Sequence, residues 1–333
     1  MWVGYVRFGL ISCMGLALLS CGRTGKGQEP LMLFYASSLE GAVERWSEMF
    51  RSRKDIEVRG ERSGSQDAAR KISELGRAAD VILVADYHVI DWLLVPNYAH
   101  WQILFAGNEI VLAHSEQSRY AAELTAGNWR EILRRPDVRL ARADENLAPI
   151  GYQSLQVCML SDLEAGVPTT DTQRSLAAQL RARVPPSLVR PNVESLASLL
   201  GLQVDYVFLF RNVAHERNLK YLRLPASINL SDPSRAAEYA RASVNIIKSA
   251  RGTTPEMIAM RGSPILYGLT IPRSARQPEA AERFVQLILG EKGQNVLEDL
   301  GFSLVRPPRA RGFAAVPKPL QPLVKAWDED STN

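Results

Sequence analysis

Residues 31–50 read LMLFYASSLEGAVERWSEMF, and this stretch predicts a buried strand that runs directly into an amphipathic helix. Leu31 to Tyr35 form a short apolar run of the length that a fully buried strand takes. Apolar residues then recur at helical spacing from Leu39 to Phe50, with mostly charged residues on the other face. Ser38 stands where such a helix takes its N-cap.

The same order of strand and helix is repeated along the chain. Residues 56–75 and 80–94 repeat it, which predicts a parallel α/β sheet. The apolar stretch 103–114 is interpreted as a strand that leaves the first lobe, and 265–272 as a strand that returns to it. We therefore expect two α/β lobes joined by two crossover strands, with a cleft that can close around a solute by hinge motion.

The expected boundaries follow from these two crossovers. Lobe 1 is predicted to comprise residues 31–113 and 264–305, and lobe 2 residues 114–263. Residues 138–141 are expected to form a strand and residues 234–249 a helix with a basic face. The stretch 306–333 is rich in Pro, Arg and Gly and is predicted to be an irregular C-terminal extension.

Composition excludes several classes of protein. The 333 residues are 46% hydrophobic and 23% charged, values typical of a globular chain and not of a disordered one. A net charge of +4 gives no support for a nucleic-acid partner. Three cysteines are too few for a disulfide framework, and the four histidines show no metal-ligand spacing. No nucleophile, phosphate-loop or zinc-helix motif is present, so we expect no enzyme activity, no cofactor and no metal.

The N-terminus has the pattern of an export signal. Arg7 precedes an apolar run from Phe8 to Leu19, which has the length of a signal-peptide core. The run ends in Leu18-Leu19-Ser20-Cys21, which resembles the lipobox of bacterial lipoproteins. Residues 1–20 are thus predicted to be a lipoprotein signal peptide, Cys21 the lipidated residue, and residues 21–30 a tether. An ordinary secretory signal with an incidental cysteine is the alternative. Either reading predicts an extracytoplasmic protein, and lipidation would anchor it to a membrane, on the periplasmic side or at the cell surface.

Three junctions between strand and helix combine small residues with hydroxyls. They are Ala36-Ser37-Ser38, Ser63-Gly64-Ser65 and Pro149-Ile150-Gly151-Tyr152. Ligands of open α/β sheets bind at such junctions, where helix N-termini favour anions. If they converge, they would offer neutral hydrogen-bond donors to the oxygens of a tetrahedral oxyanion. A serine at a single junction can equally be only a helix cap.

From about Leu31 to Leu304 the chain resembles the tungstate- and molybdate-binding components of ABC importers. The resemblance rests on a collinear set of short motifs: Ala36-Ser37-Ser38-Leu39, Gly64-Ser65, Glu74-Leu75-Gly76-Arg77, Ala85-Asp86-Tyr87, Asn108-Glu109, Asn128-Trp129, Gly151-Tyr152, Asn218-Leu219-Lys220-Tyr221, Ile228-Asn229-Leu230-Ser231-Asp232-Pro233 and Tyr267-Gly268.

The resemblance implies a type II periplasmic-binding-protein fold with an oxyanion in the cleft between the lobes. It implies that Ser38 and Ser65 are ligands and that Ala85, Gly151 and Tyr152 supply backbone donors. It also implies a monomeric protein that delivers its ligand to an ABC permease in the inner membrane.

Two departures from the family pattern concern the ligand. The related branch carries two carboxylates that reach the metal of the oxyanion, and their positions are Ala148 and Leu209 in this chain. We therefore expect a four-coordinate oxyanion that is recognised through its oxygens alone. Molybdate or tungstate is the first expectation. Sulfate, phosphate or an organic anion is an alternative, and so is a surface lipoprotein that acts as a sensor or adhesin without transport.

Overall fold

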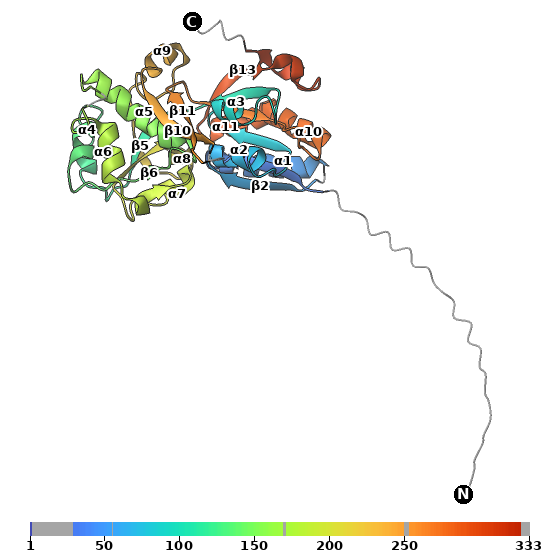
Figure 1. The fold of residues 1–333 in the computed structure, drawn as a ribbon, viewed down its shortest axis with the longest axis horizontal. Coiled ribbons are helices and arrows are strands. Elements are labelled where there is room, and N and C mark those ends of the chain that lie inside the picture. Colours follow the sequence, from blue (N-terminus) through green and yellow to red (C-terminus); the bar gives the residue numbers. More distant parts are fainter. Residues whose placement is uncertain (2–28, 55, 169–170, 250–252, 328–333) are drawn as a thin grey trace.

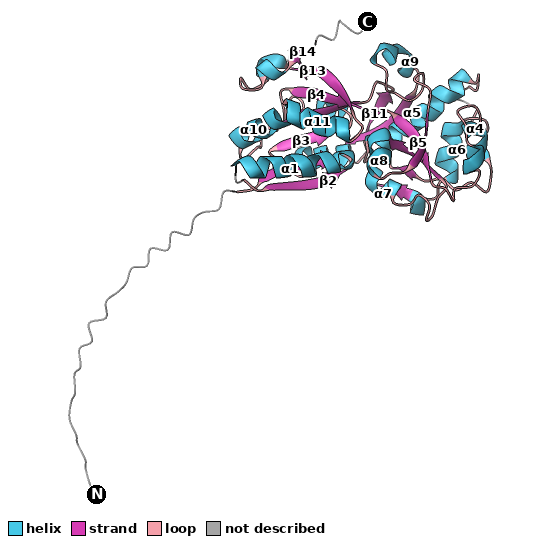
Figure 2. Cartoon of the chain, turned by 180° about the vertical axis from the view of Figure 1, so that it is seen from behind, coloured by secondary structure: helices cyan, strands magenta, loops and turns pink. Residues whose placement is uncertain are grey.

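The computed structural model describes Met1 and residues 29–54, 56–168, 171–249 and 253–327. The predicted signal peptide, Cys21 and nearly all of the tether lie outside these residues. Two bodies stand side by side, each with its own sheet and covering helices (Figures 1 and 2). We call them lobe 1 and lobe 2.

Lobe 1 is built on a seven-stranded mixed sheet in the order β14-β13-β4-β12-β3-β1-β2. Strands β1, β2 and β3 are parallel, whereas β12 returns from lobe 2 and pairs antiparallel with both β3 and β4. The strands are β1 (Leu31–Ala36), β2 (Val58–Ser63), β3 (Val81–Val84), β4 (Gln102–Gly107), β12 (Leu266–Thr270), β13 (Ser303–Arg311) and β14 (Lys325–Ala326).

Helices cover both faces of this sheet. Trp46 and Phe50 of one helix and Phe284 of another belong to the larger apolar cluster, on one side of the sheet. Phe34 and Ile82 of the strands contact Ala68 and Ile72 in a separate cluster on the other side. The helices are α1 (Glu40–Lys54), α2 (Ser65–Ser73), α3 (His88–Leu93), α10 (Pro278–Leu289) and α11 (Glu291–Asp299).

Lobe 2 has a three-stranded antiparallel sheet in the order β8-β5-β9, with two smaller strand pairs beside it. Its strands are β5 (Ile110–His114), β6 (Arg142–Ala143), β7 (Val189–Arg190), β8 (Tyr206–Phe210), β9 (Lys220–Arg223), β10 (Ser243–Ser249) and β11 (Glu256–Arg261). Its helices are α4 (Trp129–Arg134), α5 (Pro149–Glu164), α6 (Leu176–Arg183), α7 (Val193–Ala197), α8 (Arg211–Glu216) and α9 (Ala236–Tyr239).

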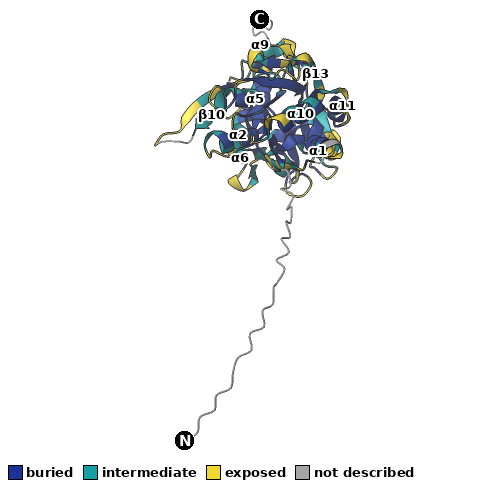
Figure 3. Ribbon diagram, turned by 90° about the vertical axis from the view of Figure 1, so that its right-hand side faces the viewer, coloured by how far each residue is buried: buried dark blue, intermediate teal, exposed yellow. Residues whose placement is uncertain are grey.

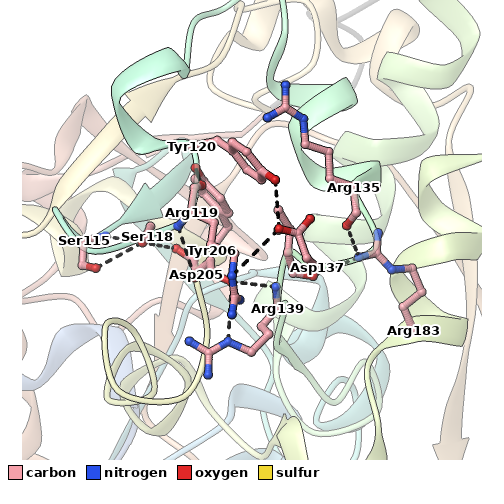
Figure 4. A network of polar contacts seen from close by, with 11 residues as sticks. Ser115, Ser118, Arg119, Tyr120, Arg135, Asp137, Arg139, Arg183, Asp205 and Tyr206 are labelled. Atoms are coloured by element: carbon pink, nitrogen blue, oxygen red, sulfur yellow. Dashed lines mark hydrogen bonds and ion pairs between the residues drawn. The ribbon is translucent and has the colours of Figure 1, made fainter.

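A buried carboxylate stabilises one end of lobe 2 (Figure 4). Asp205 is 2% exposed and accepts hydrogen bonds from the backbone N–H and guanidinium of Arg119 and from the backbone N–H of Arg139. A charge removed from water needs such partners to be tolerated. The hydrogen bonds of this cluster therefore serve the stability of lobe 2, and we assign no ligand to it.

Several sequence expectations are wrong in detail, and the first is the unbroken crossover strand. Residues 103–114 are not one strand, because β4 ends at Gly107 and β5 begins at Ile110. The backbone N–H of Asn108 instead bonds to the carbonyl of Ile265 in the second crossover. The two crossovers are thus hydrogen-bonded to each other where the chain passes between the lobes.

The chain after residue 306 is not irregular in its described part. Strand β13 pairs with β4 on both sides of a register shift between Leu304 and Arg309. Pro307 and Pro308 lie within that shift, where a strand tolerates residues without an N–H donor. The proline content of this stretch therefore led to a wrong prediction, because β13 is an integral strand of the lobe 1 sheet.

Residues 234–249 are not one helix, and residues 138–141 are not a strand. Val244 and Ile246 alternate with exposed neighbours, a period of two that suits strand β10 in its hairpin with β11. Figure 3 shows this part of β10 leading out of the body into an exposed arm. In the other stretch Leu140 makes only an isolated bridge to Tyr206, and the nearby strand is β6.

Candidate functional site

A small pocket with a volume of about 10 Å³ lies where the two lobes meet. Both lobes contribute to it, and the starts of three helices meet there. Its lining is Ala36, Ser37, Ser38, Ser63, Gly64, Ser65 and Ala85 from lobe 1, with Ala148, Pro149, Ile150, Val193 and Phe210 from lobe 2.

Ser38 reaches the pocket from the end of β1. The strand passes into a single 3-10 turn, Ser37–Leu39, which continues as α1. Ser38 is not the N-cap that the sequence predicted, because Ala36 holds that position and no side chain caps the turn. The Ser38 hydroxyl instead lies 2.9 Å from the hydroxyl of Tyr267, in the interior of lobe 1.

Ser65 reaches the pocket from the start of α2. Gly64 is the extended residue that precedes this helix, and Ser65 is its first residue. The Ser65 Oγ accepts a hydrogen bond of 2.9 Å from the backbone N–H of Ala85, which follows β3. The start of α2, which follows β2, is thereby joined to the end of β3, although β1 lies between these two strands in the sheet.

Lobe 2 contributes the start of α5. This helix of 16 residues begins at Pro149, after the extended residue Ala148. The first-turn N–H groups of a helix have no partner within the helix, and its dipole favours negative charge there. With the starts of α1 and α2 opposite, three helix N-termini are gathered around one pocket.

None of the lining residues carries a charge. The polar groups are the four serines and the backbone, and the remaining wall is apolar. Among the described residues no cluster of histidine, cysteine or acidic side chains suited to a metal ion is found. The pocket can therefore offer hydrogen bonds to the oxygens of a small anion, with no counter-charge and no metal-coordinating carboxylate.

The structure brings together only part of the predicted set. Ser38, Ser65, Ala85 and Ala148 line one pocket, although they come from four separate segments. Val193 and Phe210 also line it and were not singled out, because apolar residues in a helix start or a strand resemble ordinary core.

Three predicted residues lie just outside the lining. Gly151 is in the first turn of α5, where a Cβ would lie 2.6 Å from the backbone of Asp144. Tyr152 points to Asp86, with its hydroxyl 2.5 Å from Asp86 Oδ2. Leu209 is fully buried in β8, beside the lining residue Phe210.

Hydrogen bonds connect the lobes around this pocket. Tyr152 of lobe 2 donates to Asp86 of lobe 1. Asn212 of lobe 2 donates to the carbonyl of Ser38 over 2.8 Å. On the side of α2, Arg70 donates to the carbonyl of Asn146 over 2.6 Å. The lobes are thus in direct contact around the pocket.

The contact between Asp86 and Tyr152 is a charge-assisted one. Burial alone would raise the pKa of Asp86, but nearby His88 and the hydrogen bonds from His88 and Tyr152 outweigh it and leave that pKa below its usual value. Burial, followed by the adjacent Asp86 carboxylate, raises the pKa of Tyr152 well above its usual value. Asp86 therefore accepts as an anion and Tyr152 donates as a neutral phenol.

Comparison with known proteins identifies the family. A profile of the bacterial extracellular solute-binding proteins matches residues 31–303. The chain belongs to this family. It is 36% identical to an "Uncharacterized solute-binding protein" of Petrotoga mobilis, over 90% of this chain and 91% of that protein. It is 34% identical to the "Molybdate/tungstate-binding protein WtpA" of Pyrococcus abyssi, over 96% of each chain.

The fold matches that of solved structures at low identity. The periplasmic molybdate-binding protein of Azotobacter vinelandii superimposes with a TM-score of 0.58 at 16% identity, over 83% of this chain and 99% of the other. The predicted type II periplasmic-binding-protein fold is thereby confirmed. Membership of an extracellular solute-binding family also agrees with the predicted location outside the cytoplasm. None of the helices in the described part of the chain has the length and apolar character that a bilayer crossing requires.

Proposed function

We propose that this protein captures a tetrahedral oxyanion, molybdate or tungstate, between its lobes and delivers it to an ABC permease. The observation that carries the proposal is the neutral pocket lined by helix starts and by Ser38 and Ser65. Helix N-termini with serine hydroxyls suit a ligand that presents only acceptor oxygens.

The choice of molybdate or tungstate is supported by sequence similarity to a named relative and by the composition of the site. The relative from Pyrococcus abyssi, which aligns over 96% of this chain, bears the name of a molybdate/tungstate-binding protein. Ala148 and Leu209 occupy the two positions at which the related branch carries carboxylates that reach the metal of the oxyanion. Neither of these side chains can coordinate a metal. The ligand is therefore proposed to stay four-coordinate and to be held through its oxygens by Ser38, Ser65 and backbone N–H groups at the helix starts near Ala85, Gly151 and Tyr152. The N–H groups of Ala85 and Gly151 themselves already donate to Ser65 Oγ and to the carbonyl of Ala148.

An uncharged pocket suits an intact dianion. Two like charges at contact cost on the order of several kcal/mol even at an effective dielectric of about 20. A pocket without carboxylates avoids that cost. Selection against sulfate then depends on the size of the pocket, because sulfate presents the same acceptor oxygens.

Titration calorimetry with tungstate, molybdate, sulfate and phosphate tests the proposal. We expect tungstate and molybdate to bind at one site per chain and more tightly than sulfate. Tight binding of sulfate or phosphate alone would replace the proposed ligand and leave the site in place. Absence of heat with all four anions would refute an oxyanion-binding function and would favour the alternative of a surface lipoprotein without transport.

Export and anchoring are part of the same proposal. Cys21 at the end of the apolar N-terminal run is proposed to carry the lipid, with the folded lobes tethered as a monomer outside the cytoplasm. In cells, the wild-type protein should fractionate with membranes, and a Cys21→Ala variant should not be lipidated. Mass spectrometry of the mature N-terminus decides this, since an unmodified Cys21 would contradict lipidation.

A further inference from the structure

A buried chain of hydrogen bonds connects Ser38 to both crossover segments. The Ser38 Oγ lies 2.9 Å from the Tyr267 hydroxyl, and Asn108 Nδ2 lies 3.3 Å from the same hydroxyl. Asn108 Nδ2 also donates to Asn212 Oδ1 over 2.9 Å. All four residues are at most 3% exposed, so water does not compete for these groups.

The orientation of each amide in this chain is fixed by a partner that has only one role. Asn108 Oδ1 accepts from the backbone N–H of Glu109 over 2.9 Å, which leaves Nδ2 as its donor. Asn212 Nδ2 donates to the carbonyl of Ser38, which leaves Oδ1 to accept from Asn108. An N–H group can only donate and a carbonyl can only accept. Asn108 is therefore a donor toward Tyr267.

The direction of the bond between Tyr267 and Ser38 follows from this. Burial raises the pKa of Tyr267, so its phenol keeps its proton. Its oxygen already accepts from Asn108, and Ser38 is the acceptor within reach for its single proton. A buried O–H without a partner is costly. Tyr267 thus donates to Ser38 Oγ, and the proton of Ser38 is left for the pocket.

Ser65 is polarised in the same direction by a different donor. The backbone N–H of Ala85 can only donate, so Ser65 Oγ accepts from it and also keeps its own proton free. The hydroxyls of Ser38 and Ser65 therefore each accept a hydrogen bond from a donor within lobe 1.

We propose that Tyr267, oriented by Asn108 and Asn212, is a positioning residue that turns the Ser38 hydroxyl proton toward the pocket, so that Ser38 acts as a donor and disfavours an anion whose facing oxygen carries a proton. The inference rests on the proposed function, because it assumes that Ser38 and Ser65 contact an oxyanion. It adds a selection rule that pocket size does not supply. A ligand O–H group needs an acceptor for its proton, and a Ser38 hydroxyl that accepts from Tyr267 and turns its own proton toward the ligand serves that need poorly.

Replacing Tyr267 by phenylalanine tests the rule. Tyr267→Phe keeps the ring, which packs edge-on against Phe302 at 5.2 Å between centroids, and removes only the hydroxyl. The Ser38 hydroxyl then no longer accepts from residue 267 and can rotate to accept from a protonated ligand oxygen. We expect tungstate affinity to fall roughly threefold to tenfold, the effect of one lost hydrogen bond. Competition by phosphate, which carries a proton at neutral pH, should become relatively stronger.

Tyr206→Phe is the matched control. Tyr206 is also a fully buried tyrosine, and its hydroxyl donates to the carbonyl of Arg119 in lobe 2. We expect this variant to lose thermal stability without any change in the ratio of phosphate to tungstate affinity. An unchanged ratio in Tyr267→Phe, or a loss equal for both anions, would overturn the inference and leave the proposed function intact.

A second variant reverses the direction of the hydrogen bonds that run from Asn108 through Tyr267 to Ser38, which we call the relay. Asn108→Asp replaces the donor by an acceptor, so Tyr267 would give its proton to Asp and Ser38 would have to donate to Tyr267. We expect a larger loss of tungstate affinity than in Tyr267→Phe, and little further loss when both changes are combined. Additive losses would overturn the relay. If the wild type binds none of the anions, the proposed function fails and the inference fails with it.

Discussion

The hydroxyl of Tyr152, in lobe 2, lies 2.5 Å from Asp86 Oδ2, in lobe 1. The contact is buried, with Asp86 3% and Tyr152 1% exposed. Hydrogen bonds to an ionised group are among the stronger ones that proteins make. This pair therefore favours the arrangement in which the lobes touch around the pocket.

Asp86→Asn should destabilise the protein in a pH-dependent way. Because the pKa of Asp86 is lowered on folding, its contribution is present above the unfolded value of about 4 and is lost as the pH falls below it. At pH 7 we expect a loss of about 1–3 kcal/mol in the free energy of unfolding. Denaturant titrations at pH 7 and in the acid range measure it, and a difference from wild type that grows toward acid would contradict the assignment.

Ser38→Ala and Ser65→Ala should each weaken oxyanion binding by roughly 1–3 kcal/mol, the effect of removing a buried hydrogen bond to a charged group. Ser52→Ala is the control, since the hydroxyl of Ser52 is exposed and bonds to the carbonyl of Met49, in the same helix. Titration calorimetry on the three variants measures the effect. Wild-type affinity in both pocket variants would exclude these hydroxyls from the site.

Gly64→Ala should keep the lobes from closing. A Cβ at Gly64 would lie 2.0 Å from the carbonyl oxygen of Leu147 in lobe 2, a distance that the backbone must move to relieve. We expect at least about a tenfold loss of affinity, the equivalent of about 1.4 kcal/mol.

Gly127→Ala is the control for Gly64→Ala, because a Cβ there has Thr125 Oγ1 at 3.9 Å as its nearest neighbour. Small-angle scattering would show whether Gly64→Ala is more extended than this control when ligand is present. Equal affinities and equal profiles would mean that the close approach at Gly64 is not needed for binding.

Ala148→Asp tests the neutrality of the pocket. A carboxylate at this position would face a bound dianion, and we expect affinity to fall by more than about tenfold, since like charges at contact cost several kcal/mol. The helix itself should not suffer, because aspartate is a favoured N-cap and Ala148 precedes α5. Ala148→Asn, of the same size without the charge, is the comparison in calorimetry. Tighter binding by Ala148→Asp would instead indicate that the carboxylate coordinates the metal.

The elements of lobe 1 could be predicted from sequence because their apolar runs are long and regular. Strand β1 and helix α1 occupy almost the expected residues. The mixed direction of the sheet and strand β13 could not, since both depend on pairing between segments far apart in the chain. In β13 the residues Pro307 and Pro308 gave a false signal, which only the register shift against β4 explains.

The pocket was predictable at its serines and not at its walls. Serines that follow strands carry a signal, so Ser38 and Ser65 could be chosen in advance. Val193 and Phe210 line the pocket through the packing of lobe 2 against lobe 1, and their own sequence context is that of core residues. The hydrogen bonds behind Ser38 could not be predicted either, because Tyr267 and Asn108 are 159 residues apart in the chain.

A crystal structure with tungstate, phased on the anomalous signal of tungsten, tests the central claim most directly. The account predicts one strong peak in the pocket between the starts of α1, α2 and α5, with Ser38 and Ser65 within hydrogen-bond distance of the ligand oxygens. It predicts four oxygens around the metal and no carboxylate among its ligands. A peak elsewhere in the molecule, or a carboxylate bound to the metal, would contradict it.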